Sequence, residues 1–309
     1  MRIAQLAPPW LPVPPLAYGG TEIVVHSLTE GLVKKGHDVT LFASGDSHTS
    51  AKLSFVYEKA LGNSGYNKTE PLHPLLHYIE CFDRAGEFDI IHNHAQYYAM
   101  FLAHLVKTPV VHTVHGSYSS EYTPEEKIHT LQRFKDHKFV SISNSQREDL
   151  LGLNYVATVY NGVDTLKFGF SEKPGNYILW IGRITSKKGP VEAIKVAREL
   201  DMELKIVATI DPVEQAYFDK EVKPLIDGEL IKFDGEVKGD NKIDYYKNAL
   251  LTIYPIHWNE PFGLVMAESM CCGTPVVAYN QGSVPEIIKD GKTGFIVDSQ
   301  GPGTGNFVI

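Results

Sequence analysis

Two basic and two acidic side chains occur at short spacings in the second half of the chain. Arg183 and Lys188 lie five residues apart in GRITSKKG, and Glu260 and Glu268 lie eight residues apart in EPFGLVMAE. Two cations from one loop can converge on a phosphate-rich anion. Two carboxylates can accept hydrogen bonds from hydroxyl groups. These residue types therefore predict a site for a polyhydroxylated, anionic ligand.

Each pair also has a simpler interpretation. Arg183 and Lys188 are compatible with a solvated basic turn, and a glutamate near a helix N-terminus is favoured by the helix dipole alone. Against this, Glu268 has Met266, Ala267 and Cys271 around it, which indicates burial or a cleft. A buried carboxylate without partners costs free energy. The residues by themselves leave both interpretations open.

The two glutamates lie on a predicted strand–loop–helix–strand segment. Leu251–Ile256 is an apolar run typical of a buried strand, and Leu264–Cys272 is compatible with a helix that ends at Gly273. Pro275–Tyr279 gives the next strand. Phe262–Val265 then forms the helix N-terminus, where free amide groups and the helix dipole both attract anions.

The two cations follow another predicted strand. Tyr177–Ile181 is apolar, and we expect Arg183 and Lys188 on the loop between it and a helix at Val191–Leu200. The pattern continues with strands at Leu204–Ala208, Leu230–Phe233 and Thr293–Val297, and with a helix at Val213–Leu225. Tyr245 and Tyr246 are interpreted as core residues.

The first half alternates strands and helices in the same way. Arg2–Ala7 predicts a strand, Gly19-Gly20 a glycine-rich loop, and Thr21 the N-cap of a helix that runs to Gly36. Further strands are predicted at Asp38–Ala43, Asp89–His92, Pro109–Thr113 and Phe139–Ile142, helices at Gln96–Val106 and Gln146–Leu151, and a long loop from Ser44 to Pro74. Such alternation favours parallel α/β sheets with ligands at the strand carboxyl ends.

Four histidines gather at those predicted strand ends: His92, His94, His112 and His115. Imidazole is the commonest metal ligand in proteins. However, no Asp, Glu or Cys accompanies the His-x-His pair, so we expect no catalytic metal. His92 and His112 are interpreted as core histidines with satisfied hydrogen bonds.

A chain of 309 residues favours two domains, and Phe168–Asn176 reads as the linker between them.

Composition and charge argue against several classes of protein. Three cysteines do not form a disulfide framework. A net charge of −8 argues against a nucleic-acid partner. No apolar run is long enough to span a bilayer, which leaves peripheral membrane contact open. We expect a cytoplasmic protein, and the Gly-Gly pair is too short for an NAD fingerprint.

The segment EPFGLVMAESMCCGTPVVA resembles the E-x7-E signature of retaining glycosyltransferases of family 4, which have the GT-B fold. The G-R-x4-K-G pattern resembles the same family and covers Arg183 and Lys188. The resemblance implies two Rossmann-like domains facing a cleft: an acceptor-side domain at 1–166 and a donor-binding domain at 167–309. Relatives continue with further helices, whereas 299–309 reads SQGPGTGNFVI, so we expect truncated C-terminal helices.

The resemblance also implies roles for individual residues. Arg183 and Lys188 would bind the diphosphate, Glu260 the sugar hydroxyls, Glu268 the ribose, and His115 the donor sugar. The remaining donor contacts would come from Gly19, Gly20, Val237, Phe262, Gly263, Leu264 and Val265.

The expected activity is the metal-independent, retaining transfer of a hexose from a nucleotide sugar, of the UDP-glucose or GDP-mannose type. The acceptor would be a hydroxyl group of a small molecule or carbohydrate. We expect no cofactor, since the nucleotide sugar is a co-substrate. Two alternatives remain open: a non-catalytic nucleotide-sugar-binding protein, and a nucleotide-sugar epimerase of the same fold.

Overall fold

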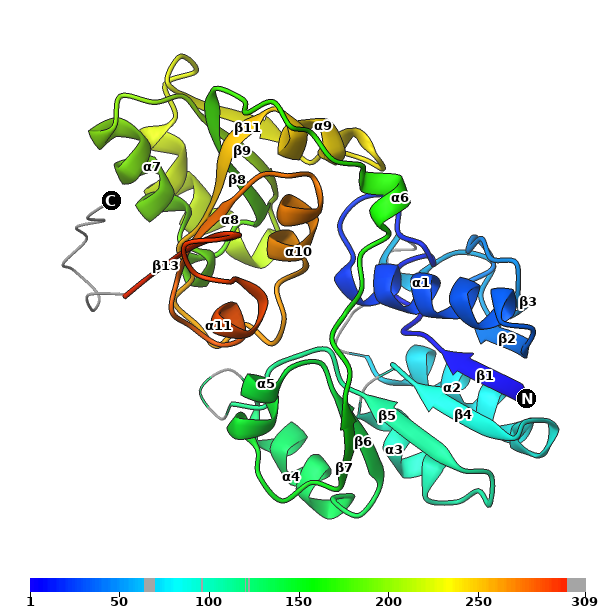
Figure 1. The fold of residues 1–309 in the computed structure, drawn as a ribbon. Coiled ribbons are helices and arrows are strands. Elements are labelled where there is room, and N and C mark those ends of the chain that lie inside the picture. Colours follow the sequence, from blue (N-terminus) through cyan, green and yellow to red (C-terminus); the bar gives the residue numbers. More distant parts are fainter. Residues whose placement is uncertain (64–69, 96, 120, 122, 299–309) are drawn as a thin grey trace. The chain divides into compact units, whose positions relative to one another are not determined.

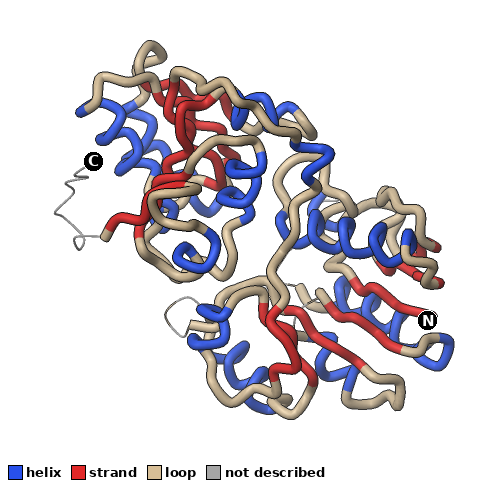
Figure 2. The backbone as a smooth tube through the Cα atoms, in the orientation of Figure 1, coloured by secondary structure: helices blue, strands red, loops and turns tan. Residues whose placement is uncertain are grey.

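The computed structural model describes residues 1–63, 70–95, 97–119, 121 and 123–298. The chain divides into two compact units, Met1–Gly162 and Val163–Ile309. Each unit is built on a parallel sheet with helices in the connections (Figures 1 and 2). The α/β prediction is therefore confirmed.

The first unit has a seven-stranded sheet in the order β3-β2-β1-β4-β5-β6-β7. The chain runs outward from β1 in one direction and then restarts at β4 on its other side. This reversal is the topological switch point, where open α/β sheets bind ligands. The strands are β1 Arg2–Leu6, β2 Asp38–Phe42, β3 Lys52–Ser54, β4 Ile90–Asn93, β5 Val110–Thr113, β6 Lys138–Ser141 and β7 Tyr155–Thr158. The helices are α1 Gly20–Lys34, α2 Leu72–Asp83, α3 Tyr98–Ala103, α4 Glu125–Arg133 and α5 Asn144–Asp149, with 3₁₀ turns at Leu61–Asn63 and Ala85–Glu87.

Helices cover both faces of this first sheet. Leu41 packs with Val25 of α1, whereas its neighbour Phe42 packs with Tyr78 and Phe82 of α2. Successive residues of a strand point to opposite faces. The sheet is therefore buried on both sides, which explains why its strands read as nearly continuous apolar runs.

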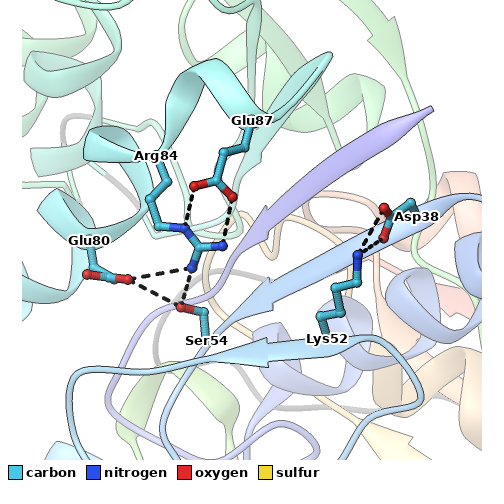
Figure 3. A network of polar contacts seen from close by, with 6 residues as sticks. All are labelled: Asp38, Lys52, Ser54, Glu80, Arg84 and Glu87. Atoms are coloured by element: carbon cyan, nitrogen blue, oxygen red, sulfur yellow. Dashed lines mark hydrogen bonds and ion pairs between the residues drawn. The ribbon is translucent and has the colours of Figure 1, made fainter.

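The edge strand β3 is attached to α2 through Arg84 (Figure 3). Arg84 donates to Glu87 through Nε at 3.0 Å and Nη2 at 2.9 Å, and to Ser54 Oγ at 2.9 Å. Lys52 pairs with Asp38 across β3 and β2 at 2.8 Å. Exposed ion pairs contribute little to the free energy of unfolding individually. We therefore infer that this network mainly keeps the edge strand β3 aligned with its neighbours.

The second unit has a six-stranded sheet in the order β10-β9-β8-β11-β12-β13, which repeats the first pattern with its switch point between β8 and β11. The strands are β8 Tyr177–Arg183, β9 Leu204–Thr209, β10 Ile231–Gly235, β11 Ala249–Tyr254, β12 Val276–Tyr279 and β13 Gly294–Val297. The helices are α6 Thr165–Phe168, α7 Pro190–Glu199, α8 Gln215–Tyr217, α9 Asn241–Lys247, α10 Leu264–Cys271 and α11 Val284–Ile287. A π-helix covers Phe218–Val222, and 3₁₀ turns cover Ser186–Lys188, Pro212–Glu214 and Lys223–Leu225.

Strand β8 shows the same two-sided burial. Ile178 and Trp180 belong to a core shared with Ile194 of α7, while Leu179 packs with Tyr246 of α9 on the other face. Helix α10 lies against α9 and stops at Gly273, whose φ of +89° lies in the left-handed region that glycine tolerates. The predicted glycine stop of α10 is confirmed.

Several predicted boundaries were wrong. Helix α1 begins at Gly20 with Gly19 as its N-cap, so Thr21 lies inside the first turn rather than capping it. The loop predicted from Ser44 to Pro74 contains β3 and the start of α2; its residues 64–69 lie outside the described part. Phe168, placed in the linker, is buried against Tyr246 instead. The sequence pattern also missed α4 and β7.

Candidate functional site

The predicted cations lie at the carboxyl edge of the second sheet, at its switch point. Strands β8 and β11 are parallel neighbours there. Arg183 is the last residue of β8 rather than a loop residue, because Gly182 and Arg183 still pair with Ala208 and Thr209 of β9. Lys188 follows at the end of a 3₁₀ turn. The loop prediction was thus wrong for Arg183, whose Nη1 lies 4.0 Å from Asp211 Oδ2.

Lys188 forms an enclosed ion pair with Glu260. The Lys188 ammonium group contacts Glu260 Oε2, and the two side chains are only 16% and 12% exposed. The same carboxylate oxygen accepts hydrogen bonds from Tyr254 Oη and Trp258 Nε1, both at 2.9 Å. The ammonium group also lies 5.4 Å and 5.2 Å from the centres of the Tyr254 and Trp258 rings. Burial and the nearby Glu260 charge raise the pKa of Tyr254, which keeps its hydroxyl protonated as a donor.

The backbone around Lys188 is held by contacts to the neighbouring strands. Trp180 Nε1 on β8 donates to the Lys188 carbonyl at 3.1 Å, and the His257 amide donates to the Lys187 carbonyl at 2.8 Å. Gly189 adopts φ +68°, and a Cβ atom there would lie 2.1 Å from the Pro255 carbonyl oxygen. The loop therefore needs glycine for both conformation and space.

The loop that carries Glu260 packs against Gly282 and Ser283, which follow β12. The Ser283 amide donates to the Glu260 carbonyl at 3.0 Å, and Ser283 Oγ donates to the Phe262 carbonyl at 2.7 Å. A Cβ on Gly282 would lie 2.5 Å from the Glu260 nitrogen. Gly263 then caps α10 with φ +77°. The first-turn amides of α10, which include Leu264 and Val265, have no carbonyl partner within the helix.

Glu268 has different partners from Glu260. Its Oε1 accepts from Lys242 Nζ at 2.5 Å, and its Oε2 accepts from Tyr246 Oη at 2.9 Å. Both donors come from α9. Val237, which follows β10, is partly buried against the hydrophobic cluster that contains Tyr246. The structure thus brings Lys188 and Glu260 together, while Glu268 stands in a second polar cluster.

In the first unit, Gly19 and Gly20 form the start of α1. A Cβ on Gly19 would lie 2.7 Å from Pro15 Cβ and 3.0 Å from Glu22 Oε2. Glu22 itself is buried, and this burial raises the pKa of its carboxyl group to about 7. Glycine at position 19 therefore allows close packing between the proline-rich segment and the first turn of α1.

The histidines of the first unit form a connected cluster at its switch point. His115 Nε2 lies 2.9 Å from His94 Nδ1, and His94 Nε2 lies 3.0 Å from Gln5 Oε1. The His92 and His94 rings lie 4.0 Å apart between centroids, and His112 contacts Asn93 and His137. Burial lowers the pKa of His92 to about 4 and that of His115 to about 3, so both rings are neutral at pH 7. Within the described ranges, no group of three or more His, Cys, Asp or Glu side chains is arranged to hold a metal ion.

Two protein-family models match adjoining parts of the chain. The model for glycosyl transferases group 1 matches residues 164–302, and the model for glycosyltransferase family 4 matches residues 18–167. The chain belongs to this glycosyltransferase family. The glycosyltransferase is accordingly an enzyme that transfers a sugar from a nucleotide sugar, and the family predicted from the E-x7-E and G-R-x4-K-G patterns is confirmed.

Curated relatives match along most of the glycosyltransferase. An uncharacterized glycosyltransferase of Methanocaldococcus jannaschii is 27% identical over 98% of this chain and 86% of its own length. A D-inositol 3-phosphate glycosyltransferase of Paenarthrobacter aurescens is 25% identical over 92% of this chain and 82% of its own.

Solved structures show the fold. Sucrose-phosphate synthase from Thermosynechococcus elongatus superposes with a TM-score of 0.80 at 20% identity, covering 97% of this chain and 86% of that one. HepE of Anabaena, crystallised with UDP and glucose, gives 0.74 at 19% identity, covering 99% and 87%. The predicted GT-B fold is confirmed. Among the described residues, the helices are too short or too polar to cross a membrane.

Sequence patterns found the charged residues of the glycosyltransferase but missed their partners. Tyr254, Trp258 and Lys242 were not predicted, although each donates to one of the two glutamates. A usable signal existed for α9, because Lys242 and Tyr246 are four residues apart and such positions share a helix face. Tyr246 is buried as predicted, and it is also a hydrogen-bond donor.

We expect Gly189→Ala to destabilise the glycosyltransferase more than Gly228→Ala. Both glycines have positive φ, +68° and +79°, but a Cβ meets nothing within 4 Å at Gly228. Strain alone should cost about 1 kcal/mol, and the clash with Pro255 should add roughly 1–3 kcal/mol. Denaturant unfolding of the two variants measures the difference. Equal losses of stability would show that the Lys188 loop adjusts freely.

The free energy of unfolding of the first unit should fall as the pH decreases below about 6.5. Five histidines have pKa values lowered by desolvation: His77, His94 and His112, which are buried, and His92 and His115, which are partly buried. Below pH 6.5 these histidines bind protons in the unfolded chain but not in the folded one. Each of them therefore lowers the free energy of unfolding by about 1.4 kcal/mol for every pH unit. Glu22, with its raised pKa, acts in the opposite direction between its ordinary value and about 7.

Denaturant midpoints at pH 7, 6 and 5 give the number of protons taken up on unfolding. His77→Gln should remove about one of them, whereas His129→Gln should not, because His129 is 65% exposed. A stability that stays constant from pH 7 to pH 5 would contradict the account of the buried neutral histidines.

Proposed function

We propose that this glycosyltransferase moves a hexose from a nucleoside-diphosphate sugar to a hydroxyl acceptor with retention of anomeric configuration and without a metal ion. The observation that carries the proposal is the enclosed Lys188–Glu260 pair at the carboxyl edge of β8 and β11. A charged pair with two aromatic donors is costly to bury. The pair lies at the switch point of the second sheet, beside the N-terminus of α10. Open α/β sheets bind ligands at this position, so the pair is placed to contact one.

The difficult step is departure of the nucleoside diphosphate while the anomeric carbon gains positive character. In our proposal Lys188, Arg183 and the backbone amides of Phe262–Val265, around the start of α10, stabilise the charge that grows on the leaving phosphate oxygens. Only the part of this interaction that strengthens in the transition state accelerates the reaction. The same groups also hold the donor in the ground state.

Glu260 would both position Lys188 and bind the sugar. Its Oε2 already accepts three donors. Within the described part of the chain the protein donors to this carboxylate all contact Oε2, so Oε1 is the atom we assign to a sugar hydroxyl. In our proposal Glu260 is not a nucleophile; instead, the departing phosphate oxygen takes the proton of the acceptor hydroxyl, as the family resemblance implies.

The remaining roles follow the same proposal. Glu268 binds the ribose hydroxyls, and Val237 contacts the base through its backbone. His115 hydrogen-bonds the donor sugar as a neutral imidazole, which the lowered pKa supports. Gly19 and Gly20 add donor contacts from the first unit. The unit at 167–309 would thus bind the donor and the unit at 1–166 the acceptor.

For the donor we propose the UDP-glucose or GDP-mannose type. HepE, whose fold this chain shares, was crystallised with UDP and glucose. The D-inositol 3-phosphate glycosyltransferase is named for a polyol phosphate acceptor, which supports a small-molecule or carbohydrate acceptor here.

The proposal is tested by incubating the full chain with UDP-glucose or GDP-mannose and a panel of polyols and sugars. We expect release of the nucleoside diphosphate and, by NMR, a product with the anomeric configuration of the donor. A product of inverted configuration would contradict retention. An isomerised nucleotide sugar formed from donor alone would indicate an epimerase, and donor binding without any turnover would indicate a binding protein.

Removal of divalent metal ions should leave the transfer rate unchanged. The charge of the leaving group would be balanced by Arg183 and Lys188, two residues that require no metal. Initial rates measured with excess EDTA should match the untreated rate. A loss that Mg²⁺ or Mn²⁺ restores would contradict the cation-based mechanism.

A further inference from the structure

Helix α9 presents two hydrogen-bond donors to the buried carboxylate of α10. Lys242 and Tyr246 are one helical turn apart, and both contact Glu268. Lys242 Nζ lies 2.5 Å from Oε1, and Tyr246 Oη lies 2.9 Å from Oε2. Each oxygen of the carboxylate therefore receives one donor from the same face of α9.

The burial of the three side chains shows that the cluster is enclosed. The Glu268 side chain is 6% exposed, that of Lys242 is 23% exposed, and Tyr246 is fully buried. Lys242 Nζ also lies 5.5 Å from the centre of the Phe168 ring. Burial and the adjacent Glu268 charge raise the pKa of Tyr246, so its hydroxyl remains a donor. A carboxylate in this position is stable only while both donors are present.

The carboxylate retains capacity for a ligand. An ionised carboxylate has about four acceptor positions, and α9 occupies one on each oxygen. One position on each oxygen is left for a pair of neighbouring hydroxyls. The ribose of a nucleotide offers such a pair at its 2′ and 3′ carbons.

We propose that Lys242 and Tyr246 are positioning residues that hold Glu268 in the orientation in which it recognises the 2′,3′-diol of the donor ribose. The inference rests on the proposed function, which assigns Glu268 to the ribose. It adds that the enzyme discriminates against 2′-deoxynucleotides and that α9 controls this discrimination.

Lys242 has a second effect on the site. Arg183, Lys188 and Lys242 carry three positive charges, and Glu260 and Glu268 carry two negative charges. Without Lys242 the site loses one of these positive charges, which disfavours a diphosphate. Loss of Lys242 should therefore weaken nucleotide binding in addition to removing the discrimination.

The test is calorimetric titration of the full chain with UDP and GDP, and with the 2′-deoxy form of whichever binds. Because a hydrogen bond to a charged group is involved, the wild type should bind the 2′-deoxy form roughly tenfold to hundredfold more weakly. Lys242→Met and Tyr246→Phe should reduce that ratio to about threefold or less. Lys242→Arg should retain most of it, because it keeps the charge and a donor.

Matched controls separate positioning from folding. Tyr177→Phe removes another buried hydroxyl of the same hydrophobic cluster, which donates to the Tyr245 carbonyl at 2.8 Å. Lys220→Met removes an 83% exposed lysine. Both controls should keep the wild-type ratio, even if Tyr177→Phe lowers the melting temperature. In steady-state kinetics, Tyr246→Phe should raise KM for the donor more than it lowers kcat.

The outcomes distinguish this inference from the proposed function. A wild type that binds the ribose and 2′-deoxy forms equally, or variants that keep the full ratio while folded, would overturn the role of α9 and leave the transferase proposal intact. A wild type that binds neither UDP nor GDP would overturn both. If Lys242→Met does not fold, Tyr246→Phe decides the question, since it removes one oxygen atom.

Discussion

Replacing Lys188 with alanine is expected to lower kcat/KM for the sugar donor by roughly a hundredfold, or about 3 kcal/mol of transition-state stabilisation. The ammonium group would be the cation nearest the leaving phosphate, and it is held by Glu260 and Tyr254 before any ligand binds. Such preorganised charge acts most strongly on charge that develops in the transition state. Initial-rate kinetics over a range of donor concentrations measures the loss.

Two variants control this result. Lys187→Ala removes the exposed neighbouring lysine and should change kcat/KM by less than about twofold. Lys188→Met combined with Glu260→Gln removes both charges of the buried pair, so it should be more stable than either single variant and still inactive. A Lys188→Ala enzyme with full activity would refute the role of this cation.

Replacing Glu260 with glutamine is expected to lower both stability and turnover. Glu260 Oε2 accepts from Lys188, Tyr254 and Trp258, and the Lys188 side chain is only 16% exposed. The amide keeps an acceptor but loses the charge, which leaves a buried cation unbalanced at a cost of about 3 kcal/mol. Turnover should also fall by about a hundredfold, because Lys188 loses the contact that positions it.

Denaturant unfolding and initial rates measure the two effects of Glu260→Gln separately. Glu203→Gln is the matched control, because Glu203 pairs with Lys232 at 2.9 Å but is 32% exposed. Its removal should cost less than about 1 kcal/mol and leave the rate unchanged. A Glu260→Gln enzyme as stable as the Glu203 control would show that the buried pair contributes nothing to the fold.

The sequence predicted best those elements in which a buried apolar run ends at a glycine. Helix α10 and strand β12 lie within one residue of their predicted bounds, because Gly273 adopts the left-handed conformation that ends the helix there. The edge strands β3 and β7 were missed because each is short and only partly buried. Helix α4 was missed because Leu131 is its only buried residue.

The candidate site was predicted in part for a related reason. Glu260 and Lys188 belong to local motifs, so their types and spacing are visible in the sequence. Their contact joins residues 72 positions apart and depends on the pairing of β8 with β11. Trp258 and Tyr254 look like ordinary core residues in the sequence, and only the structure shows that both donate to Glu260.

The most direct measurement is a crystal structure of the full chain with the nucleoside diphosphate that binds it, UDP or GDP. We predict that the terminal phosphate contacts Lys188 Nζ, the Arg183 guanidinium group and the first-turn amides of α10, and that the ribose contacts Glu268. A diphosphate bound elsewhere, with the Lys188–Glu260 pair untouched, would contradict the account.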